Sequence, residues 1–187
     1  MTIEAEELTI RRAVSADAPV VAELALRTFM EAFAADNDPD DVAAYTARVY
    51  GVRQQAAEIA DPRMITLLAE FGDTPAGYAQ VRRGPPAEPV RDVPGVVEIA
   101  RFYVDAPWHG RGVAHRLMDA VFDAARELGG RAIWLGVWER NARGIAFYTR
   151  RGFRDVGAHE FILGADHQTD RVMLKELEDT PASGRSE

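Results

Sequence analysis

The stretch from residue 96 to residue 138, VVEIARFYVDAPWHGRGVAHRLMDAVFDAARELGGRAIWLGVW, decides the fold. Its first part, 96–104, is rich in β-branched and aromatic residues, which predicts a strand. Apolar side chains then recur at helical spacing over 111–130, and the Gly129–Gly130 pair ends that pattern. A buried type of strand follows at 132–138. The order strand, helix, strand indicates a mixed α/β domain.

The flanking segments predict further helices and strands on both sides of this stretch. Residues 8–14 form a predicted strand, and Ser15 is the predicted N-cap of a helix that runs to about Ala35. In the acidic stretch 36–41, Asp38 and Pro39 mark the start of a second helix. This helix is expected to run to about Tyr50, and a third helix to continue from there through Ile59. The other predicted elements are strands at 63–71 and 76–83, a helix at 141–151, and strands at 153–163 and 169–174.

Length and composition favour one globular domain. The chain has 187 residues, of which 47% are hydrophobic and 28% charged, as is usual for a globular protein. We expect a single domain over 1–175 and a polar, disordered tail over 176–187.

Charge and cysteine content exclude several classes of function. With 30 acidic and 22 Lys and Arg residues the formal net charge is −8, which argues against a broad nucleic-acid interface. The absence of cysteine excludes disulfides, thiolate metal sites and a cysteine nucleophile. No run is long and apolar enough for a membrane span or a signal peptide, so we expect a cytoplasmic protein with neither a membrane nor a nucleic-acid partner.

The hexapeptide HGRGVA has the composition of a phosphate cradle. It follows a predicted strand and opens a helix, where unpaired N–H groups and the helix dipole favour an anion. Gly110 and Gly112 would let the backbone approach a ligand closely, and Arg111 adds positive charge. The segment lacks the ending of a Walker loop and the third glycine of a dinucleotide fingerprint.

Asn141 and Tyr148 form a second candidate pair. They lie seven residues apart on one predicted helix, so two turns place them on the same side. A tyrosine hydroxyl can donate a proton to a departing group. Each also has a structural interpretation, Asn141 as an N-cap and Tyr148 as a core aromatic.

Together these segments resemble the GCN5-related N-acetyltransferases (GNAT), most strongly over 96–157. The resemblance rests on a strand ending in RFYV, on the glycine turn GRGVA, on an Asn followed by Phe-Tyr at 141–148, and on R-x-G-F at 150–153. It implies an α/β (α+β) fold with a mixed, mostly antiparallel sheet of six to seven strands, helices on both faces and a splayed central strand pair.

The resemblance also implies acetyl-CoA as co-substrate, with no metal. The strand segment Phe102, Tyr103 and Val104 would pair with the pantetheine arm, and Asn141 would hydrogen-bond it. Tyr148 would protonate the CoA thiolate. The N–H groups of the turn would hold the pyrophosphate, and its residues are His109, Gly110, Arg111, Gly112, Val113 and Ala114. His109 stands where the family usually has Gln or Arg, and Gly144 where alanine is usual.

Glu98 is the candidate base, since a carboxylate can deprotonate an attacking amine. It alternates with Ala100, Phe102 and Val104 on one predicted strand face, although a bulge would shift that register. The alternative is a solvated glutamate at a strand end. Other acidic or titratable candidates on the acceptor side are Glu31, Asp36, Asp38, Asp40, Asp41, His159, Glu160 and Asp170.

The expected reaction is acetyl transfer from acetyl-CoA to a primary amine by direct attack within a ternary complex, since no cysteine can carry the acetyl group. Within the family the chain looks most similar to bacterial polyamine (spermidine/spermine-type) acetyltransferases, and an acidic protein suits a polycationic acceptor. Two alternatives stay open: acetylation of a protein N-terminus or lysine, and a non-catalytic acyl-CoA-binding sensor. The resemblance also suggests a homodimer, for which no residue pattern identifies an interface.

Overall fold

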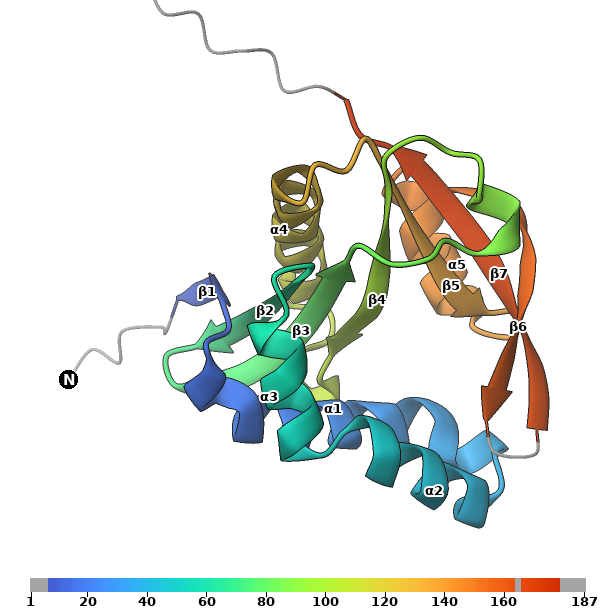
Figure 1. Cartoon of the computed structure of the whole chain (residues 1–187). Helices are drawn as coiled ribbons and strands as arrows, with labels where there is room; N and C mark the ends of the chain where they lie inside the picture. The colour runs from blue at the N-terminus through green and yellow to red at the C-terminus, as the bar shows by residue number, and fades with distance from the viewer. Residues whose placement is uncertain (1–6, 164–165, 179–187) are drawn as a thin grey trace, which may run out of the picture.

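The computed structural model describes residues 7–163 and 166–178, which form a seven-stranded sheet flanked by helices. The strand order is β1-β2-β3-β4-β5-β7-β6 (Figure 1). Within the described residues β4 and β5 are the one parallel pair. This confirms the predicted mixed, mostly antiparallel sheet. The strands are β1 Leu8–Arg12, β2 Met64–Phe71, β3 Thr74–Arg82, β4 Val96–Val104, β5 Ala132–Trp138, β6 Arg154–Leu163 and β7 Asp166–Glu176.

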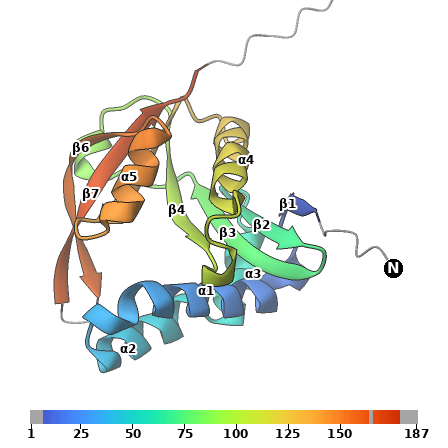
Figure 2. The ribbon, with the colours of Figure 1, turned by 180° about the vertical axis from the view of Figure 1, so that it is seen from behind.

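Helices cover both faces of this sheet. One face carries α1, α2 and α3, and the other carries α4 and α5 (Figures 1 and 2). On the α4 face Leu117, Val121 and Ile133 are fully buried, and on the α1 face Leu68 and Tyr78 are. The helix bounds are α1 Ala18–Phe33, α2 Pro39–Val49, α3 Val52–Ala60, α4 Val113–Glu127 and α5 Ala142–Arg150.

The parallel strands β4 and β5 stay together for only a short distance. Val96, Val97 and Glu98 pair with Ala132, Ile133 and Trp134, and no later residues of the two strands pair. The strands therefore separate toward their carboxyl ends, which confirms the predicted splay and opens the middle of the sheet.

A bulge in β4 changes which side chains share a face. Ala100 has no partner opposite it, since neighbouring residues of β3 pair with the residues on either side of it. An extra residue reverses the alternation beyond it, so Phe102 and Val104 pack in the core beside α4. The prediction that Glu98 shares their face is therefore wrong.

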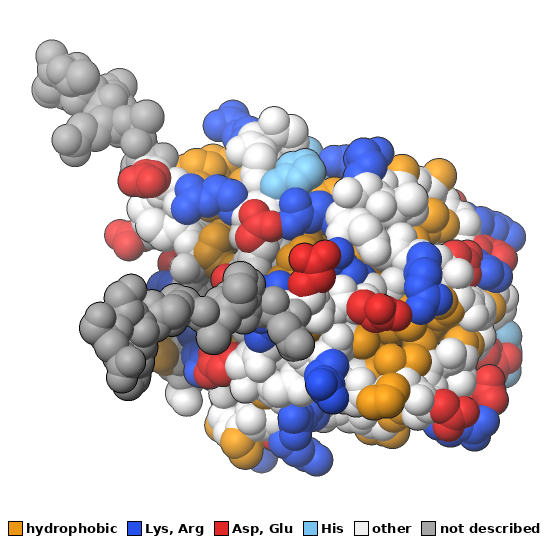
Figure 3. All heavy atoms as spheres, turned by 90° about the horizontal axis from the view of Figure 1, so that it is seen from above, with side chains coloured by type: hydrophobic (Ala, Val, Ile, Leu, Met, Phe, Trp, Pro, Cys, Tyr) orange, Lys and Arg blue, Asp and Glu red, His pale blue; other side chains and the backbone are white. Residues whose placement is uncertain are grey.

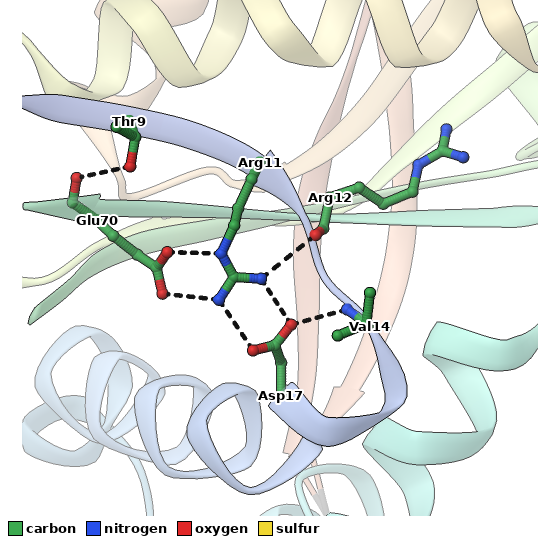
Figure 4. Close-up of polar contacts among 6 residues, drawn as sticks. All are labelled: Thr9, Arg11, Arg12, Val14, Asp17 and Glu70. Carbon is green, nitrogen blue, oxygen red and sulfur yellow. Dashed lines mark hydrogen bonds and ion pairs between the residues drawn. The ribbon is translucent and has the colours of Figure 1, made fainter. Parts of the chain in front are cut away.

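The amino-terminal strand is held in place by a charged clamp (Figure 4). Arg11 donates from Nε and Nη2 to the Glu70 carboxylate of β2, at 2.7 and 3.0 Å. It also donates to Asp17 at 2.7 and 2.9 Å, and Asp17 accepts from the Val14 N–H at 2.7 Å. Such bidentate pairs impose direction as well as attraction, so Arg11 fixes β1 and the start of α1 relative to β2.

Several element boundaries differ from the sequence-based expectations. Ser15 is not the N-cap of α1: it begins a 3₁₀ helix, Ser15–Asp17, and α1 starts at Ala18. Asp38 does cap α2, since its Oδ1 accepts from the Asp40 N–H at 2.9 Å. The third helix extends over Val52–Ala60.

At the other end of the chain, β7 continues to Glu176. The next residue, Leu177, is 8% exposed, and its N–H donates to the Arg131 carbonyl at 2.9 Å. The packed part thus reaches slightly beyond the predicted boundary at residue 175. The rest of the predicted tail, 179–187, lies outside the described residues.

Candidate active site

The separation of β4 and β5 creates a cleft of about 1110 Å³ through the middle of the molecule. Residues of α1, α2, β4, β5, α5, β6 and β7 and of the turn before α4 line it. One half lies on the α4 and α5 side of the sheet and the other on the α1 and α2 side. The two halves differ in how they are built.

The first half is bordered by the carboxyl-terminal part of β4. Phe102, Tyr103 and Val104 pair with β3 along one edge, and β5 does not pair with them along the other. That edge presents backbone donors and acceptors that a strand-like ligand arm can use. The Val104 carbonyl lies 2.7 Å from the His109 Nε2, and His109 Nδ1 lies 3.4 Å from an Arg143 nitrogen.

The glycine turn ends this half of the cleft. Gly110 and Gly112 have φ values of 76° and 81°, a region that L-residues with side chains rarely adopt. No atom lies within 4 Å of where a Cβ would stand on either glycine. The space beside the turn is therefore open to a ligand.

The N–H groups of this turn divide into two sets. His109 and Arg111 donate theirs within the turn, to the carbonyls of Ala106 and Trp108. Val113 and Ala114 open α4, where the first N–H groups of a helix have no partner in the helix, and the next two residues, His115 and Arg116, donate to the Gly112 carbonyl. A phosphate group therefore fits at the amino end of α4, and the backbone of this chain suits the CoA pyrophosphate.

Helix α5 contributes Asn141 and Tyr148. Asn141 is its N-cap, with Oδ1 accepting from the Gly144 N–H at 2.8 Å. A Cβ on residue 144 would lie 2.7 to 3.0 Å from the Asn141 amide, so an alanine at this position would require that amide to shift. The structural interpretation of Asn141 thus holds, and its side chain also lines the cleft.

Tyr148 lines the cleft among aromatic rings. Its ring centroid lies 6.2 Å from that of Phe102, 5.5 Å from Phe147 and 5.8 Å from Phe153. Burial raises the pKa of the Tyr148 hydroxyl, because it disfavours the charged phenolate. The hydroxyl is therefore protonated at neutral pH and can donate a hydrogen bond into the cleft, while the same burial makes it a weaker acid.

The second half of the cleft has aromatic walls. Phe33 contacts Trp138 with centroids 6.0 Å apart, and Tyr45 contacts Phe161 at 5.8 Å. These rings come from α1, α2, β5 and β6, so no short sequence motif brings them together. The sequence indicated them only as apolar positions at regular spacing. The aromatic residues that line this half are Phe29, Phe33, Tyr45, Tyr50, Tyr103, Trp138 and Phe161.

A buried charge pair lies beneath these rings and was not predicted. Arg101 donates to the Glu58 carboxylate of α3 at 2.5 and 3.2 Å, and to the Gln80 amide oxygen. Its guanidinium carbon lies 5.3 Å from the centre of the Tyr50 ring. Both charged side chains are only 14% and 13% exposed. Their separation of 43 residues leaves no local signal in the sequence.

The candidate base Glu98 does not reach the cleft. Its carboxylate accepts from Arg82 at 2.6 and 3.1 Å, and it is not among the lining residues. Its place along β4 accounts for this: Glu98 still pairs with Trp134 of β5, whereas the cleft begins at Ile99, where the two strands have separated.

The other acidic and titratable candidates separate into two groups. Glu31 and Asp170 line the cleft. Asp38 caps α2, and Glu160 pairs with His167 at 2.7 Å. His159 lies beside Asp170, with Nε2 4.0 Å from Oδ2. Of the acidic group Glu31, Asp36, Asp38, Asp40 and Asp41, Glu31 alone is in the lining, and Asp170 is the separate candidate that joins it.

Positive charge is concentrated locally at the cleft. Arg140, Arg143 and Arg150 line it, whereas Arg151 pairs with Asp119 on α4. The face seen from above carries blue and red side chains interspersed, without a broad basic area (Figure 3). An anionic co-substrate therefore meets arginines beside α5 although the chain as a whole is acidic.

The described ranges, 7–163 and 166–178, hold neither a metal-ligand cluster nor a membrane-spanning helix. These residues contain no group of three or more His, Asp or Glu side chains arranged to hold a metal ion. None of the helices they form is long and apolar enough to cross a membrane.

Comparison with known proteins agrees with this geometry. Residues 23–153 match the model of the acetyltransferase (GNAT) family. An uncharacterized N-acetyltransferase of Mycobacterium tuberculosis is 34% identical over 161 residues, which cover 86% of this chain and 98% of that protein. The N-alpha-acetyltransferase RimI of the same organism is 31% identical over 177 residues, covering 91% of this chain and 96% of RimI.

Two further proteins match less closely. The spermine/spermidine N(1)-acetyltransferase of Bacillus subtilis is 31% identical over 84 residues, covering 44% of this chain and 51% of that enzyme. The crystal structure of the PaiA N-acetyltransferase of Thermoplasma acidophilum with coenzyme A has a TM-score of 0.73 at 17% identity. It covers 91% of this chain and 99% of that one. The chain therefore belongs to the GNAT family and is an N-acetyltransferase that uses acetyl-CoA.

Proposed function

We propose that this enzyme acetylates the primary amine of a small cationic acceptor, of which a polyamine is the example, by direct attack in a ternary complex. The observation that carries the proposal is the composition of the second half of the cleft. Aromatic faces attract an ammonium group, and the carboxylates of Glu31 and Asp170 line the same half. The similarity to the spermine/spermidine enzyme over part of the chain supports the same acceptor class.

The first half would bind acetyl-CoA mainly through the backbone. Phe102, Tyr103 and Val104 would pair with the pantetheine arm along the open edge of β4. The turn from His109 to Ala114 would hold the pyrophosphate, Asn141 would hydrogen-bond the arm, and Arg143 would neutralise phosphate charge. His109 would have to release the Val104 carbonyl for this pairing to form.

The chain's own residues then direct the transfer. The walls of the second half hold the amine toward the thioester, and they limit the access of water that would hydrolyse it. Tyr148 donates its proton to the sulfur as the carbon–sulfur bond breaks. Glu98 is a less favoured base, since Arg82 occupies its carboxylate.

A panel of acceptors at fixed acetyl-CoA tests the proposal. Spermidine and spermine should release CoA faster than short peptides with a free amino terminus. The release can be followed as free thiol, since the enzyme has no cysteine and contributes no background. A faster rate with peptides would reassign the acceptor to protein amino termini or lysines, and tight acetyl-CoA binding without turnover would indicate a sensor.

Amino-terminal acetylation is the second candidate because of one observation. The similarity to RimI extends over 91% of this chain, whereas the similarity to the polyamine enzyme covers 44%. A peptide acceptor would need the cleft to stay open beside α1 and α2. Homodimer formation stays a prediction, which light scattering during size-exclusion chromatography would check.

A further inference from the structure

Asp170 and His159 form a titratable pair beside the second half of the cleft. They are directly opposite each other on β7 and β6. Asp170 lines the cleft, and its side chain is 15% exposed. His159 Nε2 lies 4.0 Å from the Asp170 carboxylate and is a buried nitrogen with no hydrogen-bond partner in the described part of the chain.

Gly136 of β5 makes room for this pair. A Cβ at that position would lie 2.6 Å from His159 Nε2 and 3.1 Å from Asp170 Oδ2. Gly136 also lines the cleft, one residue beyond Leu135 in the part of β5 that has left β4. The missing side chain therefore lets both titratable groups lie over the opening between the strands.

The pair also connects two cavities. Asp170 lines the main cleft, whereas His159 lines a separate shallow pocket of about 290 Å³ at the β6–β7 hairpin. His159 is 30% exposed at its side chain. His159 thus lies between Asp170 and the second pocket. The 4.0 Å between its Nε2 and the carboxylate exceeds a hydrogen bond, so a proton that leaves on this side needs a bridging water between the two groups.

We propose that Asp170 accepts the proton that the ammonium group of the acceptor must lose before attack, and that His159 passes this proton to solvent. This deepens the proposed function and rests on it. Asp170 is assigned as a catalytic residue that touches the acceptor, and His159 as a positioning residue that acts through it. Glu98 can fill neither role, because its carboxylate is hydrogen-bonded to Arg82 outside the cleft.

The proton balance of the step is complete. The ammonium nitrogen gives one proton to Asp170 and becomes a neutral nucleophile. It attacks the thioester carbon, the carbon–sulfur bond breaks, and Tyr148 protonates the sulfur. The nitrogen then loses a second proton, which restores Tyr148, while the proton on Asp170 leaves through His159. One acetyl-CoA and one ammonium ion thus yield an amide, a thiol and one proton in solvent.

The environment of Asp170 suits this exchange. Burial raises the pKa of its carboxyl group, and His159 partly opposes that increase. A carboxylate with a raised pKa is a stronger base near neutral pH. The other titratable or charged groups that line this part of the cleft are Glu31 of α1, Tyr45 of α2, Tyr50, Arg101 and Tyr103 of β4, and Arg140.

The experiment compares pH–rate profiles of the wild-type enzyme and Asp170→Asn with the fastest amine of the acceptor panel. We expect kcat to fall on the order of 10²-fold in D170N, loss of the acidic limb of the profile, and an unchanged Kd for acetyl-CoA. Asp155→Asn is the matched control, because Asp155 is a carboxylate of the same hairpin that pairs with Arg171 at 2.7 and 2.8 Å, away from the cleft.

Two further variants extend the test. His159→Gln should lower kcat about tenfold, and added imidazole should restore it, because a soluble base can replace the exit route. Gly136→Ala should displace the pair and lower kcat while the Asp170 carboxylate is retained, so a folding defect of D170N alone cannot explain the result.

Each failure has a distinct meaning. If wild-type enzyme turns over an amine and D170N matches its rate and profile, the assignment of Asp170 is overturned while the proposed function stands. Loss of the acidic limb in Glu98→Gln rather than in D170N overturns it as well. If no amine releases CoA with the wild-type enzyme, the proposed function fails and this inference fails with it.

Discussion

The two halves of the cleft are built from different parts of the polypeptide. On the side of α4 and α5, the ligand-facing groups are largely backbone N–H and carbonyl groups from one continuous segment, 102–114. On the side of α1 and α2, they are side chains of seven aromatic residues, two carboxylates and Arg101, which come from six separate segments of the chain.

This difference separates the binding of the co-substrate, which the enzymes of the family share, from the selection of the amine, which differs between them. Backbone groups present the same donors whatever the side chains are, so the first half suits one invariant co-substrate. Side chains differ in shape and charge, so under the proposed function the second half selects the amine. The predictions below test that division, from the largest expected effect to the smallest.

Removing the Tyr148 hydroxyl should have the largest effect. In Tyr148→Phe we expect kcat to fall between about 10²- and 10⁴-fold, the range of general acid catalysis. The ring and its packing against Phe102 and Phe153 remain, so the Kd for acetyl-CoA should stay within about twofold. Steady-state kinetics with calorimetry of acetyl-CoA binding checks this, and an unchanged kcat would exclude Tyr148 as the acid.

Breaking the buried pair beneath the second half should lower stability strongly. Glu58→Ala leaves Arg101 uncompensated, and loss of one partner of a buried pair costs about 3–5 kcal/mol. Urea unfolding measures the change. The exposed pair of Arg91 and Glu88 supplies the control, since Glu88→Ala should change stability by less than about 1 kcal/mol.

The buried pair of Arg101 and Glu58 also predicts how the free energy of unfolding depends on pH. Burial alone would raise the pKa of Glu58, but the hydrogen bonds and charge of Arg101 bring it below its usual value. Because the pKa of Glu58 is lower in the folded than in the unfolded protein, its ionised carboxylate stabilises the fold at pH values above the unfolded pKa, near 4.5. This stabilisation is lost as the pH falls through the folded-state pKa. The difference between wild type and Glu58→Ala should therefore shrink in acid; a constant difference would contradict the charge pairing.

A side chain at the glycine turn should weaken acetyl-CoA binding in the first half of the cleft without affecting the amine. Gly112→Ala forces a φ of 81° on a residue that disfavours it, a strain of order 1–3 kcal/mol. Relief of this strain tilts the N–H groups at the start of α4, so the Kd for acetyl-CoA should rise about tenfold while the KM for the amine changes little. Gly51→Ala, at a φ of −67°, is the control, and equal losses in both variants would argue against a phosphate cradle.

The smallest effect should come from the rim of the second half. Glu31→Gln removes one carboxylate that lines the cleft, and a rim charge acts mainly through encounter and salt dependence. We expect the KM for spermidine to rise a few fold at low salt and the difference to vanish at high salt. Asp40→Asn, outside the lining, should leave KM unchanged; equal effects would assign the attraction to net charge.

The agreement between sequence and structure follows the same division. The segments that form the first half of the cleft were predicted closely. Strands 96–104 and 132–138 have these bounds in the structure, and the glycine turn opens α4. Local chemistry sufficed there, because a strand, a positive-φ turn and a helix start are each determined by neighbouring residues. Asp38 was predicted as a cap for the same reason.

The predictions that were wrong or missing concern residues whose position depends on partners distant in the sequence. The face of Glu98 could not be predicted, because the bulge at Ala100 arises from the pairing of β4 with β3. The Arg101–Glu58 pair joins β4 to α3, and no spacing rule relates these positions. Ser15 has the composition of an N-cap, but the 3₁₀ helix that begins there moves the start of α1 to Ala18.

By itself the sequence determined the central strand–turn–helix–strand unit, and with it the family and the acetyl-CoA chemistry, because these depend on backbone conformation encoded within a few residues. The tertiary structure alone decided the aromatic second half of the cleft, the place of Glu98 outside the cleft and the meeting of Asp170 with His159 over Gly136. The physical reason is that side chains from separate segments acquire a shared environment only when the sheet has formed and β4 has separated from β5.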